Sequence, residues 1–264
     1  MADQKKYSSK LVGSRILIIG GSSGIGFSIA EACVEYGSLV TISSSNQNRV
    51  SNAVEKLKTS YPSAKERVAG LTVELSKADI LESELKTVLE SATKVLGGKL
   101  DHVIFTAGDA LATLKLEDMT VDNIIKAGQI RFFAPLLLAK FLPTYLNISY
   151  QSSYTITTGS ISERPIPNWS VIASYAGGHH AMVRNLALDL KPIRVNGVSP
   201  GVVDTELWKM SQEEKEALMT EMSEKMATGR PGHPANVAEA YLAILKDWNM
   251  DGSMVRTDGG ALLL

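Results

Sequence analysis

A glycine-rich turn near the N-terminus carries the clearest chemistry in the sequence. Gly20-Gly21-Ser22-Ser23-Gly24-Ile25-Gly26 follows the apolar run 15–20 and opens an amphipathic stretch over 25–36. Glycine permits unusual backbone angles and leaves N–H groups bare, so such a turn can bind a pyrophosphate at the start of a helix. We therefore predict phosphate contacts from Gly20, Ser22, Ser23, Gly24, Ile25 and Gly26.

The next apolar run, 38–43, ends in a polar segment without an acidic residue. Ser43, Ser45 and Asn46 lie close together there, and Arg49 follows just beyond them. A dinucleotide with two free ribose hydroxyls usually meets an acidic side chain at this place. Hydroxyls, an amide and a guanidinium suit a 2′-phosphate instead, so we expect NADP(H) rather than NAD(H). The alternative is that Arg49 only solvates the start of a helix.

Short apolar runs alternate with amphipathic segments along the chain, which predicts one α/β domain over residues 1–264. Strands are expected at 15–20, 38–43, 67–73, 101–106, 153–158, 193–198 and 253–257. Helices are expected at 25–36, 49–60, 79–96, 121–146, 171–190 and 235–247. Such alternation is typical of a parallel sheet that is covered by helices on both faces.

Residues 206–229 interrupt this alternation with a charged, methionine-rich segment that is expected to be helical. It contains Met210, Met219, Met222 and Met226. An insertion at this point would lie at the carboxyl edge of the sheet, where ligands bind. One interpretation is an ordinary amphipathic helix. The other is a mobile lid over an apolar substrate, because methionine adapts to irregular partners.

Composition excludes several classes of partner. The 264 residues include 27 Lys and Arg against 28 Asp and Glu, so no basic surplus favours nucleic-acid binding. The single cysteine, Cys33, excludes a disulfide framework and a cysteine zinc site, and we expect no metal. No apolar run approaches the roughly 18 residues of a spanning helix, and the first residues contain no secretory signal. We therefore expect a cytoplasmic protein that acts on a small molecule.

Several segments together resemble the short-chain dehydrogenase/reductase (SDR) family over about residues 10–260. They are the glycine turn, Thr106-Ala107-Gly108, the run from Ser199 to Thr205, and Thr257-Asp258-Gly259-Gly260. The resemblance implies a Rossmann-type doubly wound domain with a seven-stranded parallel sheet in the order 3-2-1-4-5-6-7 and helices on both faces. It also implies further cofactor contacts from Glu74, Ala107, Gly108, Arg131, Pro200, Gly201, Val203 and Thr205.

The catalytic Tyr-x-x-x-Lys of that family does not occur between the expected fifth and sixth strands. With residues 186–190 as the anchor, the tyrosine position corresponds to Ile172 and the lysine position to Ala176. Ser160 retains a hydroxyl near the family's serine position, and Arg131 takes its asparagine position.

Tyr175 and His179 offer a rival register, Tyr-x-x-x-His. A shift of three residues would leave Tyr175 about one turn along the helix and roughly 60° around it. The alternative is that Tyr175 packs in the core or at an interface, and that His179 and His180 lie at the surface or at an interface.

Without the tyrosine, ketone reduction loses an acid catalyst that is typically worth about 10²–10⁴-fold. Arg131 cannot replace it, because a guanidinium keeps its proton near neutral pH. Two reactions remain: hydride transfer to an iminium carbon, and a cyclisation or isomerisation driven by enclosure. Asp109 could hold a cationic substrate, and Trp169 could cover its face through a cation–π contact. The alternatives are a loop carboxylate and a packing tryptophan.

Asp109, Arg131, Trp169 and the Arg-Pro-x-Pro-x-Trp stretch resemble an atypical fungal branch of the family, the NADPH-dependent reductase/Diels–Alderases of prenylated indole alkaloid pathways. Those enzymes carry an acidic residue between the two prolines, where this chain has Ile166. We therefore expect an NADP(H)-dependent oxidoreductase of secondary metabolism that reduces an apolar, imine-like substrate, with a coupled cyclisation as a further step. The alternatives are a redox-neutral cyclase or isomerase and a non-catalytic NADP(H)-binding protein.

The same resemblance implies self-association through the fourth and fifth helices. Apolar residues cluster on the fourth helix, namely Phe132, Phe133, Leu136, Leu137 and Leu138. We expect an isologous homodimer or homotetramer. The alternative is that these residues fill the core of a monomer.

Overall fold

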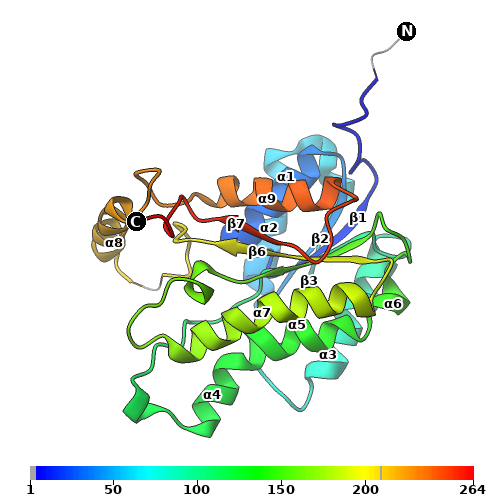
Figure 1. Ribbon diagram of the computed structural model, residues 1–264. Coiled ribbons are helices and arrows are strands. Elements are labelled where there is room, and N and C mark those ends of the chain that lie inside the picture. The colour runs from blue at the N-terminus through cyan, green and yellow to red at the C-terminus, as the bar shows by residue number, and fades with distance from the viewer. Residues whose placement is uncertain (1–3, 209) are drawn as a thin grey trace.

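The computed structural model describes residues 4–208 and 210–264, which fold around one parallel β-sheet (Figure 1). Seven strands pair in the order β3-β2-β1-β4-β5-β6-β7. In chain order they are β1 (Arg15–Ile19), β2 (Leu39–Ser44), β3 (Val68–Thr72), β4 (His102–Phe105), β5 (Ser153–Thr157), β6 (Arg194–Pro200) and β7 (Met254–Thr257). The predicted fold class and strand order are confirmed.

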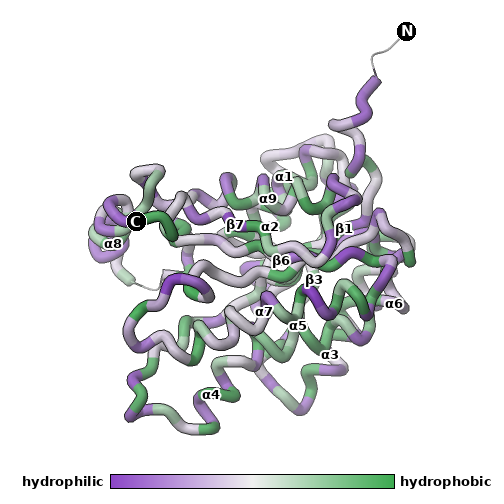
Figure 2. Tube along the Cα trace, in the orientation of Figure 1, coloured by the Kyte–Doolittle hydropathy of each residue, from purple (hydrophilic) through white to green (hydrophobic). Residues whose placement is uncertain are grey.

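Helices cover both faces of the sheet and bury its inner strands on two sides. Every residue of β4 and β6 is buried, as expected for strands enclosed on two sides. One face is covered by α1 (Gly24–Glu35), α2 (Gln47–Ser60) and α9 (Pro234–Lys246), and the other by α3 (Leu81–Val95), α5 (Ala134–Ala139) and α7 (Ser170–Asp189). Figure 2 shows hydrophobic and hydrophilic residues alternating along the helices that surround the sheet.

The segment 121–146 is helical over most of its length, as predicted, but as consecutive pieces rather than one regular α-helix. α4 (Val121–Gly128) passes into a π-helical turn, η3 (Gln129–Phe133), and then into α5 and the short α6 (Leu142–Tyr145). Proline lacks the N–H of a regular helix and its ring crowds the carbonyl four residues earlier, so Pro135 disfavours regular α-helix at this point. A π turn also shifts the following side chains around the helix axis.

The remaining elements lie in the connections. They are the short 3₁₀ turns η1 (Pro62–Arg67), η2 (Leu116–Asp118) and η4 (Ser160–Ser162), and the helix α8 (Gln212–Glu224), which forms the central part of the segment 206–229. α8 stands outside the two helical layers, next to the C-terminal end of the chain (Figure 1). Within residues 4–208 and 210–264, no helix is long and apolar enough to cross a membrane.

Candidate active site

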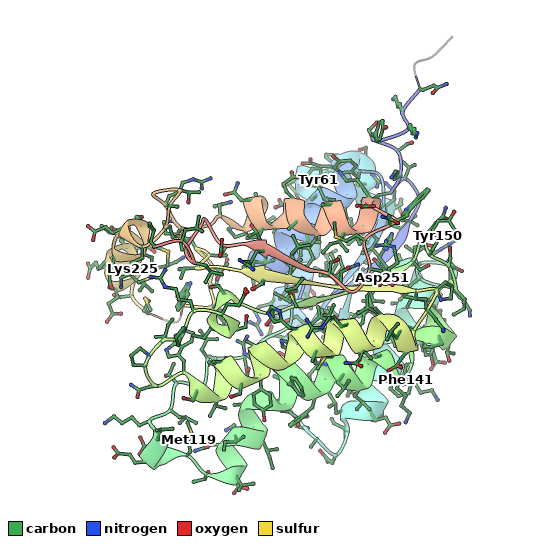
Figure 3. The ribbon with its side chains drawn as sticks, in the orientation of Figure 1. Tyr61, Met119, Phe141, Tyr150, Lys225 and Asp251 are labelled. Carbon is green, nitrogen blue, oxygen red and sulfur yellow. The ribbon has the colours of Figure 1, made fainter. Side chains whose placement is uncertain are left out.

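A large cavity opens at the carboxyl ends of the strands, where the strand order reverses between β1 and β4. In doubly wound sheets ligands bind at this point. The cavity has a volume of about 1010 Å³ and extends from the glycine turn after β1 to α8. Lys225, at the end of α8, is one of its lining residues (Figure 3).

Most of the predicted cofactor contacts line this cavity, although they come from distant parts of the sequence. They are Gly20, Ser22, Ser23, Gly24, Ile25, Gly26, Ser45, Arg49, Glu74, Ala107, Gly108, Arg131, Pro200, Gly201, Val203 and Thr205. Parallel strands place all their carboxyl ends at one edge of the sheet, which brings these segments together.

Two glycines of the turn after β1 lie where a larger residue would displace the backbone. Gly20 has a φ of 96°, and a Cβ there would lie 2.4 Å from the backbone nitrogen of Ala107. A Cβ at Gly26 would lie 2.2 Å from the Gly20 carbonyl oxygen. Ser23 precedes α1 and makes no side-chain capping bond, and the first turn of α1 contains no acidic residue. The turn therefore leaves N–H groups and a hydroxyl for a pyrophosphate, so these residues fit a dinucleotide.

The predicted ribose end contains only part of the expected set. Ser45 and Arg49 line the cavity and lie close together, with 3.5 Å between Arg49 Nη2 and Ser45 Oγ. Ser43 does not reach the cavity, because side chains alternate along β2 and its own is completely buried; Ser44 lines the cavity in its place. The Asn46 side chain instead caps α2 by accepting a hydrogen bond from the Arg49 N–H.

Glu74, predicted at the adenine end, follows β3 and lines the cavity with its neighbours Val73 and Leu75. Its carboxylate accepts hydrogen bonds from the hydroxyl and the N–H of Ser76, and these bonds lower the pKa of the Glu74 carboxyl. The Glu74 carboxylate is therefore already engaged within its own loop.

Asp109 and Arg131 form an ion pair in the middle of the cavity. Arg131 Nε lies 3.1 Å from Asp109 Oδ1, and the guanidinium also donates to the Asp109 backbone carbonyl. Burial lowers the pKa of the Arg131 guanidinium, and the charge and hydrogen bond of Asp109 oppose that effect. A Cβ at Gly108 would lie 2.7 Å from Arg131 Nη1, so a glycine here leaves space for the guanidinium. Sequence analysis selected both residues, and the fold brings them together across 22 positions.

The two remaining predicted residues also line the cavity, together with both apolar and charged side chains. Ser160 follows β5, and Trp169 stands at the start of α7. Leu218, Met222 and Met226 of the segment 206–229 line it too.

Sequence analysis missed Trp208, which also lines the cavity, whereas Arg164 begins the Arg-Pro-x-Pro-x-Trp stretch that it selected and lines the cavity as well. The Trp208 indole donates to the Val203 carbonyl at 2.9 Å, and Arg164 donates to the Ala261 carbonyl. Trp208 follows Thr205 by only three positions, so its closeness to the predicted cofactor loop was the available signal. For Arg164 the signal was that stretch, although its bonding partner lies 97 positions away.

Ile172 and Ala176, assigned to the family's tyrosine and lysine positions, are each about 6% exposed and do not line the cavity. Tyr175 turns away from it as well. The Tyr175 hydroxyl donates to the Ile124 carbonyl at 2.9 Å, and its ring packs 5.1 Å from that of Phe132. Among the described residues that line the cavity there is no tyrosine.

His179 is not at the surface, which corrects the sequence-based expectation. It is 3% exposed and bonds to the Arg131 carbonyl and the Thr158 hydroxyl. His180 is half-buried and contacts the Ser162 hydroxyl at 3.0 Å. Of the two histidines, therefore, His179 touches the backbone of a cavity residue.

The sequence pattern of the "SDR-like rossmann domain" matches residues 7–264, which is nearly the whole chain. This chain belongs to the short-chain dehydrogenase/reductase family. The SDR fold binds a nicotinamide cofactor, and the family's reactions are oxidations and reductions.

Relatives and solved structures agree with this assignment. The chain is 47% identical to the short-chain dehydrogenase/reductase fsr5 of Gibberella fujikuroi, and the alignment covers 100% of each. It is 38% identical to malC of Malbranchea aurantiaca, also over 100% of each. The structure of the MalC reductase/Diels-Alderase from that organism superposes with a TM-score of 0.92 and covers 98% of this chain and 100% of that one. A small-chain dehydrogenase in complex with NADPH is 26% identical, with a TM-score of 0.76 over 96% of this chain and 100% of that one.

Proposed function

We propose that the protein is an NADP(H)-dependent reductase that transfers hydride to the C=N⁺ carbon of an apolar iminium substrate. One observation carries the proposal. A carboxylate and an arginine, Asp109 and Arg131, are paired in the middle of a large cavity whose described lining contains no tyrosine. Such a site can hold and orient a cation but lacks the proton donor that ketone reduction needs.

NADP(H) is favoured over NAD(H) by the ribose end of the cavity. Arg49, Ser44 and Ser45 line it, and no acidic residue lies between the end of β2 and Arg49. A guanidinium with hydroxyl neighbours suits a phosphate dianion, whereas a free 2′-hydroxyl usually pairs with a carboxylate. The glycine turn and the N-terminus of α1 would hold the pyrophosphate.

The chain's own residues orient and enclose the substrate rather than move a proton. When bound, the reduced nicotinamide supplies the hydride. The Asp109 carboxylate attracts the iminium charge, and Trp169 and the apolar side chains around it exclude water. Addition of hydride to carbon sends the C=N π electrons to nitrogen, which becomes a neutral amine. No proton is required, so the fixed donors of Arg131 serve to position groups by hydrogen bonds.

A coupled cyclisation is supported by one further observation. The relative named MalC reductase/Diels-Alderase is 38% identical over 98% of this chain. The apolar side chains of the cavity lining, among them Trp169, Trp208 and Met222, would hold a flexible product in a folded shape. Reduction is the primary activity in this proposal, and cyclisation would follow in the same cavity. If the reduced product closes its ring at the same rate with and without the enzyme, the protein does not catalyse the cyclisation.

Nucleotide titration tests the cofactor part of the proposal. Protein fluorescence should show at least tenfold tighter binding of NADPH than of NADH, or about 1.4 kcal/mol. Arg49→Ala should remove most of that difference. Arg184→Ala, which alters an exposed arginine of α7 outside the cavity, is the matched control. Equal dissociation constants for the two nucleotides in the unmodified protein would reject the NADP(H) assignment.

Substrate turnover tests the reaction part. N-methyl-3,4-dihydroisoquinolinium is a permanently charged cyclic iminium, and 1-tetralone is a neutral ketone of similar shape. We expect the protein to consume NADPH with the iminium and to leave the ketone essentially untouched. Faster reduction of the ketone would contradict a mechanism that needs no proton.

A further inference from the structure

The backbone carbonyl of Arg131 lacks its regular helical partner. In an α-helix this oxygen would accept a hydrogen bond from the N–H four residues later, and that residue is Pro135, which has none. The π-helical turn Gln129–Phe133 accommodates the proline ring, and within it the Ala134 N–H bonds to the Gln129 carbonyl. A carbonyl in a largely buried helix needs another donor.

His179 supplies that donor from the neighbouring helix α7. Its Nε2 lies 2.8 Å from the Arg131 carbonyl oxygen, and the ring packs 5.5 Å from that of Phe132. The two helices approach closely here, since a Cβ at Gly178 would lie 2.7 Å from the Phe132 ring. On its other side, His179 Nδ1 lies 3.1 Å from the Thr158 hydroxyl, which belongs to the cavity wall.

These contacts fix the protonation state of the ring. A carbonyl only accepts, so Nε2 carries the hydrogen. Burial lowers the pKa of His179 to about 4, so the ring is neutral near pH 7 and Nδ1 has no proton. The Thr158 hydroxyl lies 3.0 Å from the Ala176 carbonyl oxygen, to which it donates, and 3.1 Å from His179 Nδ1, so these two acceptors share its single hydrogen.

We infer that His179 is a positioning residue: as the neutral Nε2–H form it replaces the donor that Pro135 lacks and so directs the Arg131 guanidinium onto Asp109. The backbone carbonyl that bonds to His179 and the guanidinium side chain belong to the same residue, Arg131. Loss of this bond lets the π turn relax and moves the guanidinium away from its 3.1 Å contact with Asp109. The kinetic consequence of this inference rests on the proposed function, but the geometric part does not.

The geometric part can be tested by nitrogen-15 NMR without substrate or cofactor. At pH 7 the wild-type spectrum should show His179 as the Nε2–H tautomer and a slowly exchanging Nε–H for Arg131. His179→Gln keeps a donor and should preserve the Arg131 signal, whereas His179→Phe should speed its exchange at least tenfold. His180→Gln, at the adjacent histidine, is the matched control and should leave the signal unchanged.

Three results of this experiment would overturn the inference. They are an Nδ1–H tautomer, a charged imidazole at pH 7, and an Arg131 Nε–H signal that His179→Phe does not alter. If His179→Phe does not fold, the wild-type tautomer together with the His179→Gln spectrum decides the matter.

A double-mutant cycle with NADPH and N-methyl-3,4-dihydroisoquinolinium separates positioning from general support of the fold. His179→Phe should lower kcat/KM at least tenfold in the wild-type background and less than twofold when Arg131 is already methionine. Equal losses in both backgrounds would show that His179 does not act through the guanidinium. If the wild-type protein does not reduce the iminium, the proposed function fails, while the NMR result still decides the role of His179.

Discussion

Replacing Asp109 by asparagine should weaken reduction of a cationic substrate much more than it weakens binding of a neutral one. The substitution keeps the size of the side chain but changes the local charge of the pair with Arg131 from neutral to positive. Unit charges about 4 Å apart attract by roughly 4 kcal/mol at an effective dielectric constant of about 20. The Asp109 side chain is 36% exposed and that of Arg131 21%, so solvent screens part of this energy.

We therefore expect a loss of about 2–3 kcal/mol in kcat/KM for an iminium, or roughly 30- to 150-fold. Steady-state loss of NADPH absorbance with N-methyl-3,4-dihydroisoquinolinium measures this effect, and competition by 1-tetralone reports the affinity for a neutral ring. NADPH affinity should stay within threefold, because Asp109 is not one of the predicted cofactor contacts. Asp118→Asn is the matched control, since Asp118 is exposed in η2 and outside the cavity. A kcat/KM for Asp109→Asn within threefold of wild type would refute the electrostatic argument.

Further predictions concern stability, assembly and the family's catalytic pair. Burial lowers the pKa of both His102 and His179 to about 4, below the unfolded value near 6.5, so the unfolded chain binds more protons between these pH values. The free energy of unfolding should therefore fall by about 2 kcal/mol per histidine between pH 7.5 and 5; urea titrations that show no change would contradict this. Leu136 is 44% exposed on α5, where a partner subunit could cover it. Leu136→Glu should therefore convert the homodimer or homotetramer to a monomer, as measured by light scattering. A wild-type protein that is already monomeric would disprove the predicted assembly. The double substitution Ile172→Tyr with Ala176→Lys should not create ketone reductase activity, and rapid reduction of 1-tetralone would contradict this. It should also lower Tm by about 5 °C or more, because it buries an unpaired ammonium group.

The sheet was predictable because each strand is a short apolar run that ends at a recognisable turn. Alternation of strands and helices then determined the fold class, and the family resemblance supplied the strand order. The division of the predicted helix 121–146 was less accessible. Pro135 was visible in the sequence, but whether it breaks, kinks or converts a helix depends on which donors the neighbouring helix offers.

The candidate site was predictable where backbone geometry alone selects the residue. Gly20 and Gly26 belong to a motif, and Asp109 lies in the short loop that follows β4. Ser43 illustrates the limit: a shift of one residue in the alternation along β2 moves a side chain from the cavity into the core, and the sequence does not determine that register. Trp208 and Arg164 lie in irregular segments, whose positions depend on contacts that are distant in sequence.

The bond between His179 and the Arg131 carbonyl has an evolutionary consequence. A proline at position 135 and a donor at position 179 are useful only together: the proline removes the N–H, and the histidine replaces it. Loss of the histidine alone would leave a buried acceptor without a partner, at a cost of about 1–3 kcal/mol. Lineages that descend from a common ancestor should therefore change the two positions jointly, or acquire the histidine before the proline. Reconstructed ancestral sequences would show whether the histidine was acquired before the proline or together with it.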